Sequence, residues 1–212
     1  MKLYTYWRSS AAFRVRIALA LKGIQVDQIP VHLLNNGGEQ HSEGYQQRNP
    51  AELVPALELE QGSLNQSLAI IQYLEALYPE PALLPADPWL KAQVMALALD
   101  IACDIHPLNN LRVLQYLTGT LAVDETQKLA WIHHWLHTGF SALEKRLQAS
   151  AGLYCFGNSV TLADLCLVPQ IYNALRFNLD MTGYPTLQKI YQHCMQQPAF
   201  LQAAPEQQLD AQ

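Results

Sequence analysis

The chain has 212 residues, 50% of them hydrophobic and 15% charged, which is enough for one large or two smaller domains with apolar cores. A formal net charge of −5 argues against a general nucleic-acid-binding protein. No apolar run is long enough to span a bilayer, and the N-terminal MKLYTYW has no signal-peptide core. We therefore expect a soluble, cytoplasmic protein with neither nucleic acid nor membrane as a partner.

The first eighty residues predict an α/β domain. Residues 2–6, KLYTY, favour a short strand, and residues 10–21 place Phe13, Ile17 and Leu21 on a helical stripe that Gly23 ends. Residues 24–33 predict a second strand interrupted by a proline, followed by a polar loop over 35–44.

Two further strands and a helix complete this domain. The segments VPALELE at 54–60 and GSLNQ at 62–66 predict a hairpin with a tight turn at Gln61-Gly62. Residues 67–79 then predict a helix that a proline ends. The order β-α-β followed by β-β-α predicts a thioredoxin-like fold for residues 1–80.

The rest of the chain predicts an all-α domain. Residues 79–88 carry four prolines and indicate a linker. Helical periodicity then dominates residues 89–212, with helices expected over 89–117, 125–149, 162–175 and 186–197. Within this domain Thr161-Leu162-Ala163-Asp164 fits a capping box, which gives Asp164 a structural role.

The four cysteines predict free thiols. They are Cys103, Cys155, Cys166 and Cys194, which form no CxxC pair and fall in apolar, helically patterned segments. Buried thiols in a reducing compartment fit this pattern better than a disulfide framework does.

Three places in the thioredoxin-like half are suited to binding. Ser9 and Ser10 lie where a strand leads directly into a helix, so unpaired N–H groups and the helix dipole favour an anion such as a thiolate. A serine that simply caps the helix explains this stretch equally well. A cis Val54-Pro55 bond would turn the Val54 backbone outward to pair with an extended peptide. Gln66-Ser67 opens another helix, so the set suits glutathione, an acidic peptide with a thiol.

Motifs along nearly the whole chain resemble the zeta class of the glutathione transferases. They are YWRSS…FRVRIALALKGI, NP…LVPALE, NQSLAIIQYLE, LLPADP, DIHPLNNLRVLQYL and TLADLCLVPQ…RF. The chain departs from the Ser-Ser-Cys hallmark of that class, because Ala11 and Ala12 follow Ser9 and Ser10. We interpret this loss as tolerable if glutathione, and not the protein, supplies the reacting sulfur.

The resemblance implies a glutathione-binding set that draws on both halves of the chain. Ser9 would hydrogen-bond the sulfur, Gln40 the glycyl end, the Val54 backbone the peptide, and Gln66 with Ser67 the γ-glutamyl end. The complete set is Ser9, Ser10, Ala11, Ala12, Phe13, Arg14, Gln40, Val54, Gln66, Ser67, His106, Asn110, Leu111 and Arg112. The last four belong to the helical half, and some of their contacts are made from the partner subunit in related dimers; we expect a homodimer here.

The activity implied is a glutathione-dependent cis–trans isomerisation of maleylacetoacetate in tyrosine and phenylalanine breakdown. Such a dicarboxylic enone needs a thiolate beside cations that bind its carboxylates. Arg8 and Arg176 are the candidates for the carboxylates, and Ser9 for the thiolate. His106 is a candidate for stabilising the enolate or for binding glutathione, although a histidine beside a proline also has structural roles.

Several alternatives remain open. Arg8 and Arg176 would also fit surface salt bridges, and Arg14 and Arg16 would fit helix packing. The pair His133 and His137 lies one helical turn apart, but with no third ligand we expect no metal site. The substrate could instead be maleylpyruvate, the chain could be a transferase or dehalogenase acting on α-haloacids, or it could be a non-catalytic scaffold.

Overall fold

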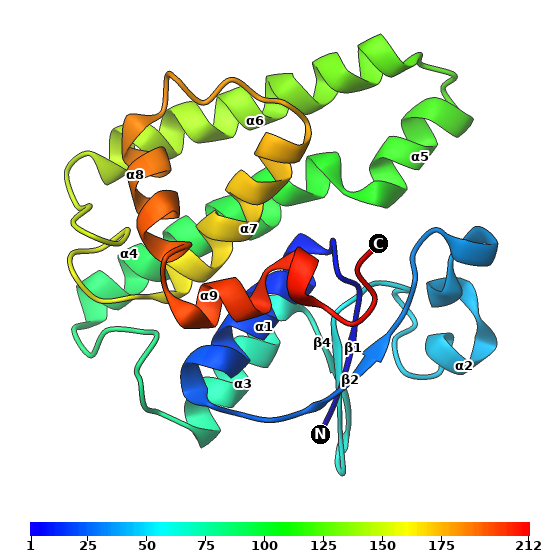
Figure 1. Ribbon diagram of the computed structural model, residues 1–212, viewed down its shortest axis with the longest axis horizontal. Helices are drawn as coiled ribbons and strands as arrows, with labels where there is room; N and C mark the ends of the chain where they lie inside the picture. Colours follow the sequence, from blue (N-terminus) through cyan, green and yellow to red (C-terminus); the bar gives the residue numbers. More distant parts are fainter. The chain divides into compact units, whose positions relative to one another are not determined.

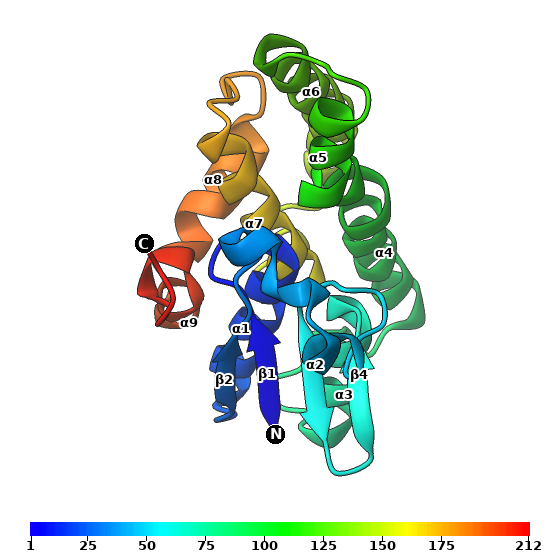
Figure 2. The same cartoon turned by 90° about the vertical axis from the view of Figure 1, so that its right-hand side faces the viewer.

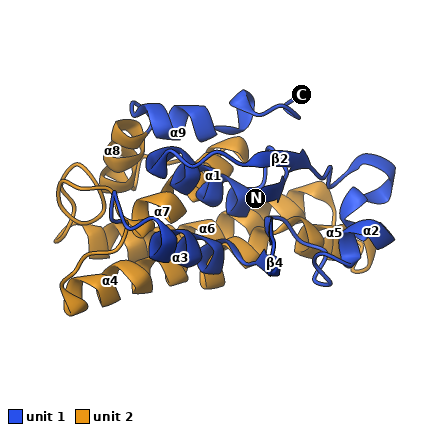
Figure 3. Cartoon of the chain, turned by 90° about the horizontal axis from the view of Figure 1, so that it is seen from below, with its two compact units in different colours: residues 1–82, 195–212 blue, residues 83–194 orange.

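The computed structural model describes residues 1–212, which form two compact units. Unit 1 contains Met1–Ala82 together with Met195–Gln212, and unit 2 contains Leu83–Cys194 (Figure 3). The expected helical domain, 89–212, therefore extends too far. Its last eighteen residues group with the N-terminal segment, because α9 (Pro198–Ala203) packs along α1 (Ser10–Lys22).

Unit 1 is built on a four-stranded mixed sheet with strand order β2-β1-β3-β4. The neighbours β1 and β2 are parallel, while β1–β3 and β3–β4 are antiparallel. The strands are β1 (Lys2–Thr5), β2 (Asp27–Pro30), β3 (Ala56–Leu59) and β4 (Gly62–Asn65). This arrangement, β-α-β followed by β-β-α, confirms the thioredoxin-like prediction.

Two predictions for this sheet need correction. The strand expected over 24–33 is only four residues long and ends at Pro30, opposite Thr5, where its partner strand β1 also ends. β2 is an edge strand, where a proline is tolerated. The hairpin turn lies at residues 60–61 and not at Gln61-Gly62, because Gly62 already pairs with Leu59.

The helices of unit 1 lie on both sides of the sheet. α1 and α3 (Ser67–Leu77) pack together on one face, and the segment with α2 (Glu43–Gln46) lies on the other side (Figures 1 and 2). The expected loop over 35–44 contains the 3₁₀ turns η1 (Asn35–Gly37) and η2 (Glu39–His41). The core between sheet and helices includes the fully buried side chains of Leu3, Ile17, Leu57, Ile70 and Leu74.

Unit 2 is entirely helical, as predicted. Its central helix is α7, which is buried on nearly every side and packs against both α4 and α8. The α-helices of this unit are α4 (Pro88–Leu99), α5 (Leu111–Gly119), α6 (Glu125–Leu147), α7 (Leu162–Arg176) and α8 (Pro185–Cys194).

Two of the predicted helices are shorter than expected. The helix predicted over 89–117 is broken by a π-helical turn, η3 (Asp100–Ile105), and a 3₁₀ turn, η4 (His106–Asn109). Pro107 cannot donate a helical hydrogen bond, and the Asn110 side chain caps a new helix by accepting the Arg112 N–H at 3.2 Å. The helix predicted over 186–197 likewise ends at Cys194.

Asp164 has the structural role that its capping motif predicts. Its fully buried carboxylate accepts hydrogen bonds from the Thr161 N–H at 2.8 Å, the Thr161 hydroxyl at 2.9 Å and the Cys155 N–H at 2.8 Å. Cys155, Cys166 and Cys194 are buried and form no disulfide, and burial raises the pKa of Cys155 and Cys194. Cys103 is exposed in η3, against expectation.

No helix in the chain has both the length and the apolar character required to cross a bilayer.

Candidate functional site

Ser9 lies at the junction between β1 and α1 and is the N-cap of that helix. Its extended backbone (φ −71°, ψ 115°) directs the side-chain Oγ to accept the Ala12 N–H at 3.2 Å. The capping interpretation is thus correct, and it is compatible with a second role. A capping hydroxyl uses its oxygen as acceptor, so its proton remains available to donate to an anion. The first turn of α1 contains no acidic residue that would repel one.

Arg8, next to Ser9, is held by two aromatic neighbours. Its Nη2 donates to the Tyr6 hydroxyl at 3.1 Å, and its guanidinium lies over the Trp7 ring, 4.6 Å from the centroid. No carboxylate forms an ion pair with Arg8, and its Nε is buried without a hydrogen-bond partner. A held guanidinium with an unmet donor is suited to a carboxylate ligand. The surface salt-bridge interpretation of Arg8 does not hold.

The start of α3 is a second position suited to an anion. The N-cap, Gln66, provides no side-chain cap, and the first turn has no acidic residue. The hydroxyl of Ser67, which is buried, accepts from Arg14 Nη1 at 3.3 Å, so a cation supports the helix start. Gln66 has a φ of 68°, a left-handed conformation that is uncommon for a residue with a side chain. Such conformations often occur at ligand-binding positions.

The backbone of Val54 is available for pairing. The Val54-Pro55 bond is cis, and Val54 precedes β3, which begins at Ala56. The Val54 backbone belongs to no strand ladder and pairs with no other backbone group. Two bonds to the neighbouring Leu53 carbonyl, from Tyr45 Oη and Asn49 Nδ2, both 2.6 Å long, hold this segment in place.

Gln40, predicted to bind the glycyl end, is buried beside Gly38. Its Nε2 lies 3.0 Å from His41 Nε2, while its Oε1 is buried with no partner. A side chain at Gly38 would displace the Gln40 amide, because a Cβ there would lie 2.4 Å from Nε2 in its present position. Together with the two helix starts and the open Val54 backbone, these groups fit a short peptide that carries carboxylates and a thiol.

The other predicted residues of α1 form the support of this site. Ser10, Ala12, Phe13 and Arg14 are buried, and Ala11 is half-buried. Unit 1 contains no cysteine, since all four lie within residues 83–194. Any nucleophilic sulfur at this site must therefore come from outside unit 1.

The remaining candidates belong to unit 2. His106 begins η4, Asn110 and Leu111 begin α5, and Arg112 follows with an exposed side chain. Arg176 is the last residue of α7, is exposed, and lies over the Phe177 ring at 4.5 Å.

The histidine pair on α6 has other partners. His133 Nε2 lies 2.8 Å from the Phe177 carbonyl, and His137 Nδ1 lies 2.7 Å from the Tyr184 hydroxyl. Each ring is thus engaged in packing the helices of unit 2. No group of three or more histidine, cysteine, aspartate or glutamate side chains is placed to hold a metal ion.

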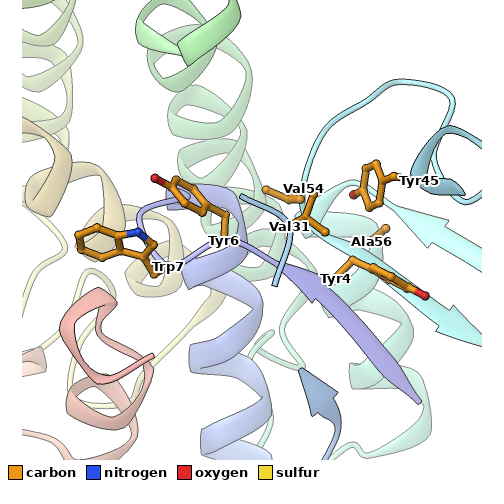
Figure 4. Packing of buried hydrophobic residues seen from close by; sticks show 7 residues of the cluster. All are labelled: Tyr4, Tyr6, Trp7, Val31, Tyr45, Val54 and Ala56. Atoms are coloured by element: carbon orange, nitrogen blue, oxygen red, sulfur yellow. The ribbon is translucent and has the colours of Figure 1, made fainter. Parts of the chain in front are cut away.

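Sequence reasoning missed the residues that hold Arg8. Tyr6 and Trp7 belong to a buried cluster with Tyr4, Val31 and Val54, and Figure 4 shows their rings at the end of β1. Aromatic residues favour strands, so the sequence pattern indicated a strand here and gave no indication of contacts with Arg8. Tyr6 and Trp7 are buried like Tyr4 and Thr5 before them, so no local pattern distinguishes their role from that of strand residues.

Two family models match the chain, the glutathione S-transferase N-terminal domain over residues 3–82 and the C-terminal domain over residues 136–198. A probable maleylacetoacetate isomerase of Vibrio cholerae is 56% identical over 99% of this chain and 97% of its own length. The structure of a bacterial zeta-class maleylpyruvate isomerase superposes with a TM-score of 0.97 at 45% identity, covering both chains completely.

A maleylacetoacetate isomerase of Methylobacterium extorquens, with bound malonate and glutathione, superposes with a TM-score of 0.95 at 38% identity, again over the full length of both chains. The similarity to these proteins covers both units and includes the helix starts described above. The chain belongs to the zeta class of the glutathione S-transferase family.

Proposed function

We propose that this protein is a glutathione-dependent cis–trans isomerase that converts maleylacetoacetate to fumarylacetoacetate in tyrosine and phenylalanine catabolism. The observation that carries the proposal is the adjacency of Arg8 and Ser9 at the start of α1. One holds an unpaired guanidinium donor and the other a free hydroxyl proton. A carboxylate site beside a thiolate site is what an acidic enone and a thiol together require.

Glutathione fits the groups of unit 1. Ser67, the N-terminus of α3 and the cation of Arg14 would hold the γ-glutamyl end, and the Val54 backbone would pair with the peptide. Gln40 would contact the glycyl end at the position of its unpartnered Oε1. If the amide is flipped, its NH₂ group occupies that position and can donate to the glycyl carboxylate. The residues at the start of α1, Ser9 to Arg14, would surround the sulfur. We propose residues 1–80 as the glutathione-binding domain.

When bound, glutathione supplies the sulfur that adds to the cis double bond, allows rotation about the resulting single bond, and then leaves. Ser9 donates its hydroxyl proton toward the sulfur and thereby favours the ionised form. The N-terminus of α1 adds its unpaired N–H groups and positive dipole end. Arg8 binds a substrate carboxylate from its fixed position between Tyr6 and Trp7.

The absence of cysteine from unit 1 supports a sulfur that comes from the cofactor. Ala11 stands where the class hallmark has cysteine, so no protein thiol is present at the start of α1. The buried cysteines of unit 2 have raised pKa values or no access to solvent, which makes them poor nucleophiles.

From unit 2 we propose five further residues. Arg176, exposed at the end of α7, would bind the second substrate carboxylate. His106, Asn110, Leu111 and Arg112 would contribute to glutathione binding, and His106 also to stabilising the enolate. We propose that the protein is a cytoplasmic homodimer, in keeping with its family and with its free thiols.

A second candidate substrate is maleylpyruvate. The bacterial maleylpyruvate isomerase that superposes at a TM-score of 0.97 favours it, and both substrates are dicarboxylic cis enones that differ in the length of one arm. Arg8 would bind a carboxylate of either one, so the two proposals share the same chemistry and the same glutathione site.

The test is to measure kcat/KM with maleylacetoacetate, with maleylpyruvate and with an α-haloacid, each with and without glutathione. The proposal predicts that maleylacetoacetate gives the highest value and that every activity needs glutathione. A higher kcat/KM with maleylpyruvate would make maleylpyruvate the substrate. A higher kcat/KM with the haloacid would show a transferase or dehalogenase instead of an isomerase. Arg8→Ala provides the variant arm, since it should raise KM for the dicarboxylates and leave glutathione binding intact.

A further inference from the structure

The C-terminal segment is tied to the connection between β1 and α1. The Asp210 carboxylate accepts the backbone N–H of Trp7 at 3.0 Å, across 203 positions of sequence. Ala211 packs against the aromatic cluster that contains Tyr6 and Trp7. The end of the chain thus meets the residue that precedes Arg8 and Ser9.

Arg16 forms a second tie between the same two segments. Its buried guanidinium donates from Nε to the Ala203 carbonyl at 3.0 Å and from Nη2 to the Trp7 carbonyl at 2.9 Å. Nη1 donates to the Tyr6 carbonyl at 3.3 Å and to the Thr5 hydroxyl at 3.1 Å. One side chain therefore joins the end of α9 to both peptide groups that lead into Arg8.

The tail that presents Asp210 is itself folded. After α9 the chain forms a 3₁₀ turn, η5 (Pro205–Gln207), and the Gln208 amide then donates to the Ala204 carbonyl at 2.8 Å and the Gln202 carbonyl at 3.0 Å. Gln208 is buried by these contacts. Asp210 follows two residues later, so its carboxylate is carried by an ordered segment.

These ties act on the backbone that orients Ser9. β1 ends at Thr5, so the Trp7 N–H has no strand partner and depends on Asp210. The Ser9 N–H donates at 3.0 Å to the Tyr6 carbonyl, the same oxygen that Arg16 contacts. The direction of the Ser9 hydroxyl and of the Arg8 side chain is therefore set by peptide groups that Asp210 and Arg16 hold.

We propose that Asp210, together with Arg16, is a positioning residue for the reaction, acting through Trp7 on the turn that contains Arg8 and Ser9. The inference rests on the proposed function in that it takes Ser9 as the donor to the glutathione sulfur. Asp210 touches neither substrate nor cofactor in this role. Its contribution is to keep the Ser9 hydroxyl in one direction, since a small misplacement of a catalytic group can cost up to about 10²-fold in rate.

The experiment compares Asp210→Ala, which removes the acceptor, with Asp210→Asn, which keeps an oxygen in place. Gln212→Ala is the matched control, because it alters the same tail beyond the tie. In each protein the ionisation of bound glutathione is titrated by the ultraviolet absorbance of its thiolate, kcat and KM are measured, and hydrogen exchange of residues 6–10 is followed without glutathione.

We expect Asp210→Ala to raise the pKa of the bound thiol by about one unit, which is a tenfold loss of thiolate at a fixed pH below it, and to lower kcat about tenfold. Exchange of residues 6–10 should quicken, while binding of S-methylglutathione, which has no thiol, should stay near wild type. Asp210→Asn should restore most of each value, and Gln212→Ala should match wild type throughout.

An unchanged thiol pKa and unchanged exchange in a folded Asp210→Ala variant would overturn the positioning role. A wild-type protein that does not ionise glutathione at all would instead overturn the proposed function, and the exchange measurement would still report on the tie. If Asp210→Ala does not fold, Arg16→Lys tests the same connection through its other member. We expect the same rise in the pKa of the bound thiol, and an unchanged pKa with unchanged exchange would again overturn the positioning role.

Discussion

Replacing Ser9 separates helix capping from catalysis, because different substitutions remove different parts of the side chain. Ser9→Ala removes both the oxygen that accepts the Ala12 N–H and the proton proposed to reach the sulfur. Ser9→Gly also removes the hydroxyl, but glycine is itself a tolerable N-cap. Ser9→Thr retains the hydroxyl and the cap. The three variants therefore distinguish a residue that only supports α1 from one that acts on the cofactor.

The magnitudes follow from the observed contacts. Loss of one cap at a half-buried position should lower the free energy of unfolding by about 1 kcal/mol for Ser9→Ala and by a few tenths for Ser9→Gly. For a chain of this length, about 1 kcal/mol corresponds to a fall in Tm of roughly 2–4 °C. A hydrogen bond to a charged sulfur contributes about 1.5–3 kcal/mol, so kcat/KM should fall roughly 10- to 150-fold in both variants.

The assay is the loss of absorbance of the cis enone at saturating glutathione, with thermal unfolding measured on the same samples. Asp124→Ala is the matched control, because Asp124 caps α6 by accepting the Gln127 N–H at 2.8 Å and has no proposed part in the chemistry. It should lose similar stability and keep its kcat/KM. A Ser9→Gly variant with wild-type activity would refute the thiolate role and leave Ser9 as a helix cap alone.

Three further predictions concern the surroundings of the site. Tyr6→Phe removes the hydroxyl that accepts a hydrogen bond from Arg8. KM for the dicarboxylate should therefore rise about threefold to tenfold, with little change in KM for glutathione. An equal rise in both KM values would contradict the role of this contact in holding Arg8. Burial raises the pKa of Tyr45 to about 12 in the folded protein, so the unfolded chain loses this proton first and stability should fall as pH rises above 10. Thermal unfolding at increasing pH should show a shallower fall in Tyr45→Phe, and identical slopes would exclude this cause. Asp164→Ala leaves the buried N–H groups of Thr161 and Cys155 without an acceptor, and denaturant unfolding should show a loss of about 3 kcal/mol; a loss below about 1 kcal/mol would show that water replaces the carboxylate.

The sequence predicts most elements because local chemistry decides them. Gly23 ends α1 in a left-handed conformation with φ 65°, which favours glycine, and the periodicity of α3 and α6 gives their bounds within two residues. The prolines at positions 30 and 107 are visible in the sequence, but the sequence alone does not say whether the element ends there. Whether a proline ends an element or is absorbed into it depends on packing, and Pro169 lies inside α7 without breaking it.

The site is predictable where a residue acts through its own position at a helix start, as with Ser9 and Ser67. Other features depend on long-range contacts that no local pattern contains. The support of Arg8 by Tyr6, the cation of Arg14 beneath Ser67 and the tie from Asp210 all need the folded chain. The grouping of residues 195–212 with unit 1 has the same origin, since it rests on α9 packing against α1 and on one buried arginine.

The proposed function requires that glutathione supplies the reacting sulfur and is regenerated in each turnover. The most direct measurement starts from enzyme freed of all glutathione, mixes it with excess cis enone, and then adds glutathione in an amount far below that of the substrate. No turnover before the addition, complete conversion after it, and full recovery of free glutathione at the end are the predicted results. Isomerisation before any glutathione is present, or its consumption in proportion to product, would contradict the account.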